Sequence, residues 1–369
     1  MRELQLESYD YVLPKERIAT YPIAPKEAAK LLVYERASDK IIHTTFKDFA
    51  NFLPQETLLV FNNTKVLPAR LYGTKVVQDS KNPSAKGARI EALFHKEITP
   101  NVYLMQFKGR LKVGHLVVFE GGIFARILKD YQDSTLGVGF KEVEFFKIPQ
   151  QSLPNYLQFF SKTLESPLNR AEFFEFLEHF GHIPLPPYLK RQDTQADKKD
   201  YQSVFAKHLG AIAAPTASLH FSEESYKNLK QNFQSAEITL HVGAGTFVGV
   251  QSENILAHKM HKEHFFISQD SADKIYQASH ITAIGTTAAR TIEEFARNGK
   301  LSGECDLFLH PQNKPRKTNA LLTNFHLPKT TLLMLVASFV GLDTMQRLYK
   351  EAIARNYRFY SYGDGMLIL

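Results

Sequence analysis

Two apolar stretches in the second half of the chain each give way to a loop of histidine, hydroxyl-bearing and small residues. The first runs Gly210-Ala-Ile-Ala-Ala-Pro-Thr-Ala-Ser-Leu-His-Phe221, and the second runs Thr239-Leu-His-Val-Gly-Ala-Gly-Thr-Phe247. Buried strands are enriched in β-branched and aromatic residues, whereas binding and catalytic residues concentrate on loops. The polar side chains of these loops therefore predict a functional site where two strands end.

The chain from residue 210 onward alternates short apolar runs with amphipathic segments. We expect strands over residues 238–242, 281–284 and 306–309, and helices near 271–279, after Thr287, over 328–339 and over 343–355. Such alternation is typical of an α/β sheet, in which ligands bind at the carboxyl ends of the strands. Both polar loops fall at such ends.

Residues 66–149 have a different character. Short apolar runs follow one another between glycines and polar turns, over residues 89–94, 102–107, 115–119 and 123–128. This spacing predicts a small antiparallel β-barrel. Residues 169–180 then place phenylalanines on one face of an amphipathic helix. Because 369 residues exceed one ordinary core, we expect two domains.

Composition narrows the class of protein. Hydrophobic residues make up 44% of the chain and charged residues 22%, as in soluble globular proteins. We find no secretory signal at the N-terminus, and the longest apolar run, over residues 332–340, is far shorter than the roughly 20 residues that span a bilayer. A single cysteine, Cys305, excludes an internal disulfide. We therefore expect a cytoplasmic protein without a membrane segment.

The charge balance permits a polyanionic partner. The net charge is +7, and residues 310–369 hold eight Lys or Arg against three acidic residues. A basic end of the chain suits a surface that faces phosphates, although an ordinary solvated face is an equally good interpretation.

Some familiar motifs are excluded. Residues 243–249 approach a dinucleotide-binding fingerprint, but the third glycine comes one position late and no helix follows. No glycine loop carries the lysine of a nucleotide-hydrolysing site. His258, His261 and His264 do not favour a metal, because on a helix the first and last lie about 120° apart, and on a strand the middle one faces away. We expect no metal and no bound cofactor.

Three further segments carry candidate chemistry. The segment Gly285-Thr-Thr-Ala-Ala-Arg290 starts a helix, where free amides, hydroxyls and an arginine suit an anion, although a plain helix cap explains it equally well. The segments Thr323-Asn-Phe-His-Leu-Pro328 and Tyr362-Gly-Asp-Gly365 place polar groups beside aromatic rings that suit a stacked base or a cation. A turn with a capping aspartate is the simpler interpretation of either one.

Together these runs resemble the S-adenosylmethionine:tRNA ribosyltransferase-isomerase family of queuosine biosynthesis. The matching runs are spread over nearly the whole chain: 9–14, 59–70, 201–202, 213–216 with 219–221, 240–243 with 245–247, His258 with 260–261 and Glu263, 285–287 with Arg290, 323–328, 357–359 and 361–364. The chain departs from the family pattern at Ser218, Ala244, Gly365 and the 310–317 loop. None of these departures removes a candidate catalytic group.

The resemblance implies a fold and a reaction. The fold is a large α/β mixed-sheet, barrel-like domain, residues 1–65 plus 150–369, into which residues 66–149 are inserted as a small antiparallel β-barrel. In the reaction, the ribosyl moiety of S-adenosylmethionine is transferred to the 7-aminomethyl group of 7-aminomethyl-7-deazaguanine in tRNA and isomerised. The products are epoxyqueuosine-tRNA, adenine and methionine. S-adenosylmethionine is thus a consumed co-substrate, and the family suggests a monomer.

The resemblance also implies roles for residues. A sulfonium acidifies the neighbouring ribose carbon, so we hypothesise a base among His220, His241, Glu263 and His326. The residues expected to bind S-adenosylmethionine are Thr216, Phe221, Gly243, Gly245, Thr246, Phe247, Thr286, Thr287, Arg290, Asn324, Tyr362 and Asp364. Those expected to contact tRNA are Lys329, Arg358, Arg316 and Lys317. The alternatives are a small-molecule sugar or nucleotide isomerase and a non-catalytic RNA-binding protein.

Overall fold

The computed structural model describes residues 2–76, 87–131, 139–147, 167–243, 245, 249–250 and 252–369. The chain divides into two compact units, a large one of Met1–Val66 with Leu185–Leu369 and a small one of Leu67–Pro184. The small unit is thus inserted into the sequence of the large one. It extends beyond the expected end at residue 149, because the helix at residues 170–180 packs on its core.

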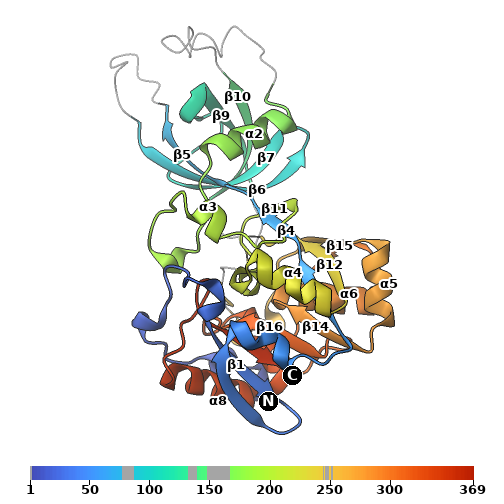
Figure 1. Cartoon of the computed structure of the whole chain (residues 1–369). Coiled ribbons are helices and arrows are strands. Elements are labelled where there is room, and N and C mark those ends of the chain that lie inside the picture. The colour runs from blue at the N-terminus through green and yellow to red at the C-terminus, as the bar shows by residue number, and fades with distance from the viewer. Residues whose placement is uncertain are drawn as a thin grey trace. The chain divides into compact units, whose positions relative to one another are not determined.

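A nine-stranded mixed sheet forms the large unit (Figure 1). Its order is β15-β13-β12-β3-β14-β16-β17-β1-β2. In that order the strands span Ser302–Cys305, Glu263–Ile267, Ser235–Leu240, Thr57–Asn62, His280–Ile284, Ala320–Asn324, Gly365–Ile368, Lys30–Glu35 and Lys40–Thr45. The sheet is open, with β15 and β2 at its edges. The α/β class with a mixed sheet is therefore confirmed, although the barrel-like curvature does not close.

The four strands β12, β3, β14 and β16 are mutually parallel and form the centre of the sheet. Strand β3 is buried at every position, which explains why its sequence, TLLVFN, is an unbroken apolar run between Thr57 and Asn62. Because the strands are parallel, the segments after β12, β14 and β16 emerge at one edge of the sheet. This edge carries the candidate site.

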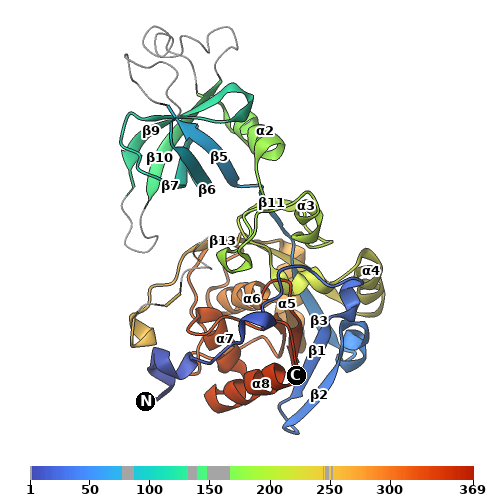
Figure 2. The same ribbon diagram turned by 90° about the vertical axis from the view of Figure 1, so that its left-hand side faces the viewer.

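Helices connect the strands. They are α3 (Asp197–Asp200), α4 (Glu223–Asn232), α5 (Gln269–Gln277), α6 (Thr286–Asn298), α7 (Thr331–Val340) and α8 (Leu342–Ala354). Figure 2 shows α7 and α8 side by side. One expected strand is wrong, because residues 306–309 lie beyond β15, which ends at Cys305. The helix expected over residues 328–339 is present as α7, but it begins at Thr331, because Thr330 caps it by accepting a hydrogen bond from the Leu333 amide.

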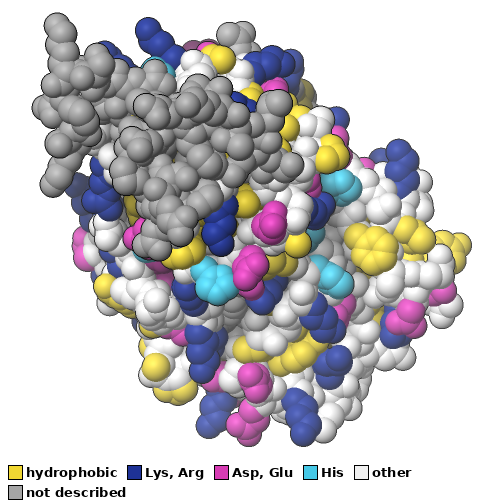
Figure 3. All heavy atoms as spheres, turned by 90° about the horizontal axis from the view of Figure 1, so that it is seen from above, with side chains coloured by type: hydrophobic (Ala, Val, Ile, Leu, Met, Phe, Trp, Pro, Cys, Tyr) yellow, Lys and Arg dark blue, Asp and Glu magenta, His cyan; other side chains and the backbone are white. Residues whose placement is uncertain are grey.

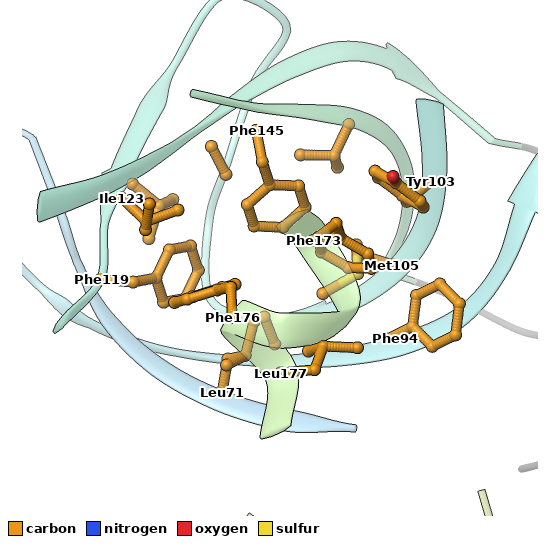
Figure 4. Packing of buried hydrophobic residues seen from close by; sticks show 14 of the residues in the cluster. Leu71, Phe94, Tyr103, Met105, Phe119, Ile123, Phe145, Phe173, Phe176 and Leu177 are labelled. Atoms are coloured by element: carbon orange, nitrogen blue, oxygen red, sulfur yellow. The ribbon is translucent and has the colours of Figure 1, made fainter. Parts of the chain in front are cut away.

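The small unit contains a closed antiparallel barrel in the order β10-β7-β6-β5-β8-β9. Its strands are β5 (Arg70–Lys75), β6 (Arg89–Thr99), β7 (Val102–Lys108), β8 (Leu116–Val118), β9 (Ile123–Asp130) and β10 (Phe140–Lys147). Figure 4 shows Phe173, Phe176 and Leu177 of α2 (Arg170–Phe180) pointing into this core. The ring of Phe173 stacks on Tyr103 with centroids 3.8 Å apart. The inserted β-barrel is confirmed.

No single helix among the described residues is long and apolar enough to cross a membrane. Helices α7 and α8 reach the required length and composition only when they are joined, and they bend by 111° at their junction.

Candidate active site

A cleft of about 850 Å³, its open mouth included, lies in the large unit at the carboxyl edge of the parallel strands. Segments that follow β14, β16 and β11 (His208–Ala211) form most of its wall. The lining residues are Tyr188, Tyr201, Ala213, Ala214, Pro215, Thr216, Ala217, Val242, Glu263, Gly285, Thr286, Thr287, Arg290, Thr323, Asn324, Phe325, His326, Leu327, Thr330, Leu332, Tyr360 and Ser361. Apolar and aromatic residues form about half of this wall, and residues with hydroxyl, amide, imidazole or charged side chains form the rest, a mixture that suits a small polar molecule.

One polar feature of the cleft is the N-terminus of α6. Gly285 precedes the helix with φ of +97°, a conformation that glycine adopts at little cost, and its amide donates to the Leu322 carbonyl at 2.8 Å. No side chain of the described residues caps this helix. The amides of its first turn and the Thr286 hydroxyl therefore suit a carboxylate or phosphate. The Thr287 hydroxyl is already bonded within the protein, because it accepts a hydrogen bond from the Asn62 side-chain amide at 3.0 Å.

A buried ion pair between Glu263 of β13 and Arg290 of α6 forms part of the same wall. Their side chains are only 4% and 8% exposed. Glu263 also accepts from the Gly243 amide at 3.0 Å, and Arg290 donates to the carbonyls of Cys305 and Leu307, each at 3.2 Å. Burial lowers the pKa of Arg290, but Glu263 outweighs it, so the pKa lies above its usual value. Each charged group is bonded within the protein, so the ion pair links strand β13 to helix α6.

A second hollow of about 480 Å³ adjoins this ion pair. Glu263 and Arg290 line both spaces, and the second is also lined by His258, Met260 and Phe308. The ring of Phe308 meets that of His258 edge to face, with centroids 6.0 Å apart. No group of His, Cys, Asp and Glu that could hold a metal ion occurs among the described residues.

Of the four candidate bases, Glu263 and His326 line the cleft, whereas His220 and His241 do not. His326 bonds through Nε2 to the Thr323 hydroxyl at 2.8 Å, and burial lowers its pKa to about 3. His241 lies behind the wall, because its neighbour Val242 takes the cleft position, and it bonds to the Thr64 hydroxyl at 2.8 Å. Burial, and the neighbouring His264 and His208, lower the pKa of His241.

His220 is buried behind the cleft. Its ring stacks on Phe46 with centroids 3.9 Å apart, and its Nε2 lies 3.1 Å from the Asn324 side-chain nitrogen. Burial, together with the nearby cations Arg358 and Lys26, lowers the pKa of His220 to about 3. His220 is therefore an uncharged imidazole at neutral pH.

Among the residues expected to bind S-adenosylmethionine, five described ones lie away from the cleft wall. Phe221 packs in the core, edge to face with Phe49 at 5.7 Å. Tyr362 donates to Asp197 at 2.8 Å. Asp364 accepts from the amides of Lys30 and Arg358 at 2.9 and 2.7 Å, which is the capping role that its turn motif predicts.

The glycine loop contributes less than expected to the described wall. Gly243 bonds to Glu263 and Gly245 lines the second hollow, where a β-carbon at Gly245 would come within 2.3 Å of the His261 ring. Thr246 and Phe247 lie outside the described residues. The residues brought together at the cleft are thus Thr216, Thr286, Thr287, Arg290 and Asn324.

The structure adds residues that the sequence reasoning missed. Tyr188 and Tyr360 line the cleft with their rings 4.6 Å apart, and Ser361 bonds to the Tyr188 hydroxyl. Tyr360 stands in the closing aromatic run of the chain, but Tyr188 follows three prolines and gave no recognisable signal. Their proximity depends on chain segments that are far apart in sequence.

The four residues expected to contact tRNA differ in their surroundings. Lys329 pairs with Glu7 and Asp10, at 2.8 and 3.0 Å, and Arg358 lies 3.7 Å from Asp364. Lys317 donates to carbonyls at the end of α5, whereas Arg316 is exposed. On the face shown in Figure 3, Lys and Arg lie among Asp and Glu rather than in one patch.

The 310–317 loop, which departs from the family pattern, is anchored by a fully buried carboxylate. Glu293 of α6 accepts from the amides of Arg316, Lys317 and Thr318 at 2.7 to 2.8 Å, and it pairs with Arg297 at 3.2 Å. The loop therefore has a fixed attachment to the helix whose first turn lines the cleft.

We expect Glu293→Gln to lower the free energy of unfolding by about 2–3 kcal/mol, because an amide NH₂ would face buried donors. Glu294→Gln on the same helix is the matched control and should cost less than about 1 kcal/mol. Urea unfolding followed by circular dichroism measures both, and tryptic cleavage after Arg316 should become faster only in Glu293→Gln. Equal costs in the two variants would contradict the anchoring role.

An α/β sheet with an aromatic cleft at its carboxyl edge, buried histidines and an uncapped helix N-terminus defines an enzyme-like site for a small polar ligand. The chain belongs to the family of the queuosine biosynthesis proteins, since the model of that family matches residues 6–368. The resemblance noted from the motifs is thereby confirmed.

Individual relatives match over their full lengths. A protein of Campylobacter jejuni subsp. jejuni (strain 81-176) is 48% identical, over 100% of this chain and 99% of its own. One from Helicobacter pylori (strain HPAG1) is 46% identical, over 100% of both chains. Both are named S-adenosylmethionine:tRNA ribosyltransferase-isomerase. The crystal structure of the S-adenosylmethionine tRNA ribosyltransferase of Thermotoga maritima is 28% identical with a TM-score of 0.51, covering 98% of this chain and 100% of its own.

Proposed function

We propose that the chain is an S-adenosylmethionine:tRNA ribosyltransferase-isomerase. It transfers and isomerises the ribosyl moiety of S-adenosylmethionine onto the 7-aminomethyl group of 7-aminomethyl-7-deazaguanine in tRNA, releasing adenine and methionine. The observation that carries the proposal is full-length identity of 46–48% to proteins of that name, in a chain with a cleft for a small polar ligand.

The cleft suggests how S-adenosylmethionine binds. A carboxylate such as that of its methionine moiety is best placed at the first turn of α6, against the free amides and the Thr286 hydroxyl. Arg290 lies in the wall but is paired with Glu263, so we propose that it stabilises helix α6 and does not bind the carboxylate of the ligand. The aromatic side chains of Tyr188 and Tyr360 offer surfaces for adenine or for the sulfonium.

Among the candidate bases, His326 is the one we propose. It lines the cleft and is uncharged at neutral pH, so one ring nitrogen is free of a proton. The Thr323 hydroxyl at 2.8 Å orients the ring. Glu263 is a weaker candidate because its carboxylate is already bonded to Arg290 and to the Gly243 amide.

The substrates are S-adenosylmethionine and tRNA carrying the modified base. We propose that the enzyme acts in the cytoplasm, where tRNA is found, and that it acts as a monomer. Of the expected tRNA contacts, Arg316 is the best supported, because it is exposed and stands on the anchored 310–317 loop.

Adenine release from S-adenosylmethionine, followed with and without tRNA bearing 7-aminomethyl-7-deazaguanine, tests the function. We expect release only with the modified tRNA, and a rate that falls steeply as salt is raised, because counterions compete for the phosphate contacts. Turnover of small sugars or nucleotides that is insensitive to salt would favour the small-molecule isomerase instead. If the protein binds RNA but releases no adenine under any condition, the remaining alternative is a non-catalytic RNA-binding protein.

A further inference from the structure

The side-chain amide of Asn324 occupies an unusual position at the end of β16. Asn324 is 1% exposed and lines the cleft. Its nitrogen lies 3.1 Å from His220 Nε2, 3.2 Å from the Tyr360 carbonyl and 3.4 Å from the Asp364 carbonyl. Its oxygen Oδ1 is buried and has no hydrogen-bond partner among the described residues. A buried acceptor without a partner is costly unless a ligand satisfies it.

The orientation of this amide follows from its neighbours. Backbone carbonyls only accept hydrogen bonds, so the atom near Tyr360 and Asp364 has to be the NH₂ group. The same group donates to His220 Nε2, which must then be the unprotonated ring nitrogen. With both N–H bonds used within the protein, Asn324 offers a ligand only its oxygen.

The neutral form of His220 is held by its surroundings. Its ring stacks on Phe46 at 16° between the planes, and the charged groups that act on it are the cations Arg358 and Lys26. Cations and burial both disfavour a protonated ring. Phe46 in turn packs closely on Gly365, where a β-carbon would come within 2.6 Å of its ring. Gly365, one of the departures from the family pattern, thus contacts the Phe46 ring on which His220 stacks.

We propose that His220 is a positioning residue, which fixes the Asn324 amide so that Oδ1 accepts a hydrogen bond from the exocyclic amine of the adenine of S-adenosylmethionine. This inference rests on the function proposed above. His220 does not line the cleft and so acts through Asn324. The adenine amine is the best-fitting donor, because the acceptor is uncharged, the aromatic residues Phe325 and Tyr360 belong to the same cleft wall, and Glu263, the one carboxylate among the described lining residues, is already paired.

The test compares S-adenosylmethionine with S-inosylmethionine, in which a carbonyl replaces the amine. We expect the wild-type enzyme to prefer the adenine compound in kcat/KM by about 100-fold or more, because two acceptors would face each other in the inosine complex. Asn324→Ala should lose about 10- to 100-fold in kcat/KM with S-adenosylmethionine and most of that preference. An Asn324→Ala enzyme that keeps the full preference would overturn the assignment of the amine.

Three His220 variants separate positioning from base catalysis. The kcat/KM of His220→Ala with S-adenosylmethionine should fall toward that of Asn324→Ala. The kcat/KM of the double variant, His220→Ala with Asn324→Ala, should lie within about twofold of that of Asn324→Ala, since the two residues act as one unit. His220→Gln keeps an acceptor for the Asn324 amide, so its kcat/KM should stay within about threefold of the wild-type value, and the dependence of kcat/KM on pH should be unchanged. If His220→Gln is as inactive as His220→Ala, or loses one limb of the pH profile, the positioning role is refuted.

Two controls complete the design. His280 bonds to the Thr57 hydroxyl at 2.8 Å, at the amino ends of β14 and β3 and hence away from the cleft, so His280→Ala should leave the preference between the two compounds unchanged. Should His220→Ala fail to fold, Asn324→Ala and His220→Gln still decide the question. If the wild-type enzyme releases no adenine, the proposed function fails, and calorimetric binding of both compounds to wild type and Asn324→Ala still tests the contact separately.

Discussion

The Arg290→Met variant should lose about 3–5 kcal/mol of the free energy of unfolding, because the change leaves the Glu263 carboxylate buried without its counter-charge. Both side chains are less than a tenth exposed. Arg290 also satisfies the carbonyls of Cys305 and Leu307, at 3.2 Å each, and these would lose their donors. The chain has no tryptophan, so urea unfolding followed by far-UV circular dichroism is the suitable measurement.

A matched pair of variants checks the cause of this loss. Arg347 pairs with Asp39 at side-chain exposures of 45% and 64%. Arg347→Met therefore breaks a solvent-exposed ion pair and should change the free energy of unfolding little. Arg290→Met combined with Glu263→Gln should recover part of the loss, because no uncompensated charge then remains buried. Equal losses in Arg290→Met and Arg347→Met would show that the buried pair does not hold β13 to α6.

Acidification from pH 7 to pH 5 should lower the free energy of unfolding by about 4 kcal/mol through His220 and His326 together. Burial lowers the pKa of each to about 3 in the folded protein. In the unfolded chain, each has a pKa near 6.5. Between these values the unfolded chain binds protons that the folded chain does not, so stability decreases as pH falls.

Single substitutions should divide this effect. His220→Gln and His326→Gln should each remove about 2 kcal/mol of the loss between pH 7 and pH 5, since each histidine contributes about half. The measurement is the urea midpoint, with its slope, at several pH values for the wild type and both variants. A wild-type stability that stays constant over this range, or a slope that neither variant reduces, would show that the two rings are protonated in the folded protein.

Local sequence was sufficient to predict most of the elements. The unbroken apolar run of β3 and the apolar faces of α2 depend on the periodicity of nearby residues, and the structure has both. Boundaries that depend on packing were less predictable. The expected strand at residues 306–309 is irregular, and its carbonyl at Leu307 binds the Arg290 side chain instead.

The approximate place of the site was also predictable, because ligand sites in such sheets lie at the carboxyl ends of parallel strands. Segments after β14 and β16 do line the cleft. The orientation of single side chains was not predictable. Val242 takes the cleft position beside His241, and Phe221 packs into the core, although both loops have the composition of a site.

The sequence by itself determined the family, the α/β class with its inserted barrel, and the set of loops that supply the cleft, since these follow from motifs and from hydrophobic periodicity. Only the tertiary structure decided which side chains act. The bond between His220 and Asn324 joins residues 104 positions apart, and the pair of Glu263 with Arg290 joins a strand to a helix. Burial, charge state and the direction of a side chain depend on neighbours that the fold brings together, and no local pattern records them.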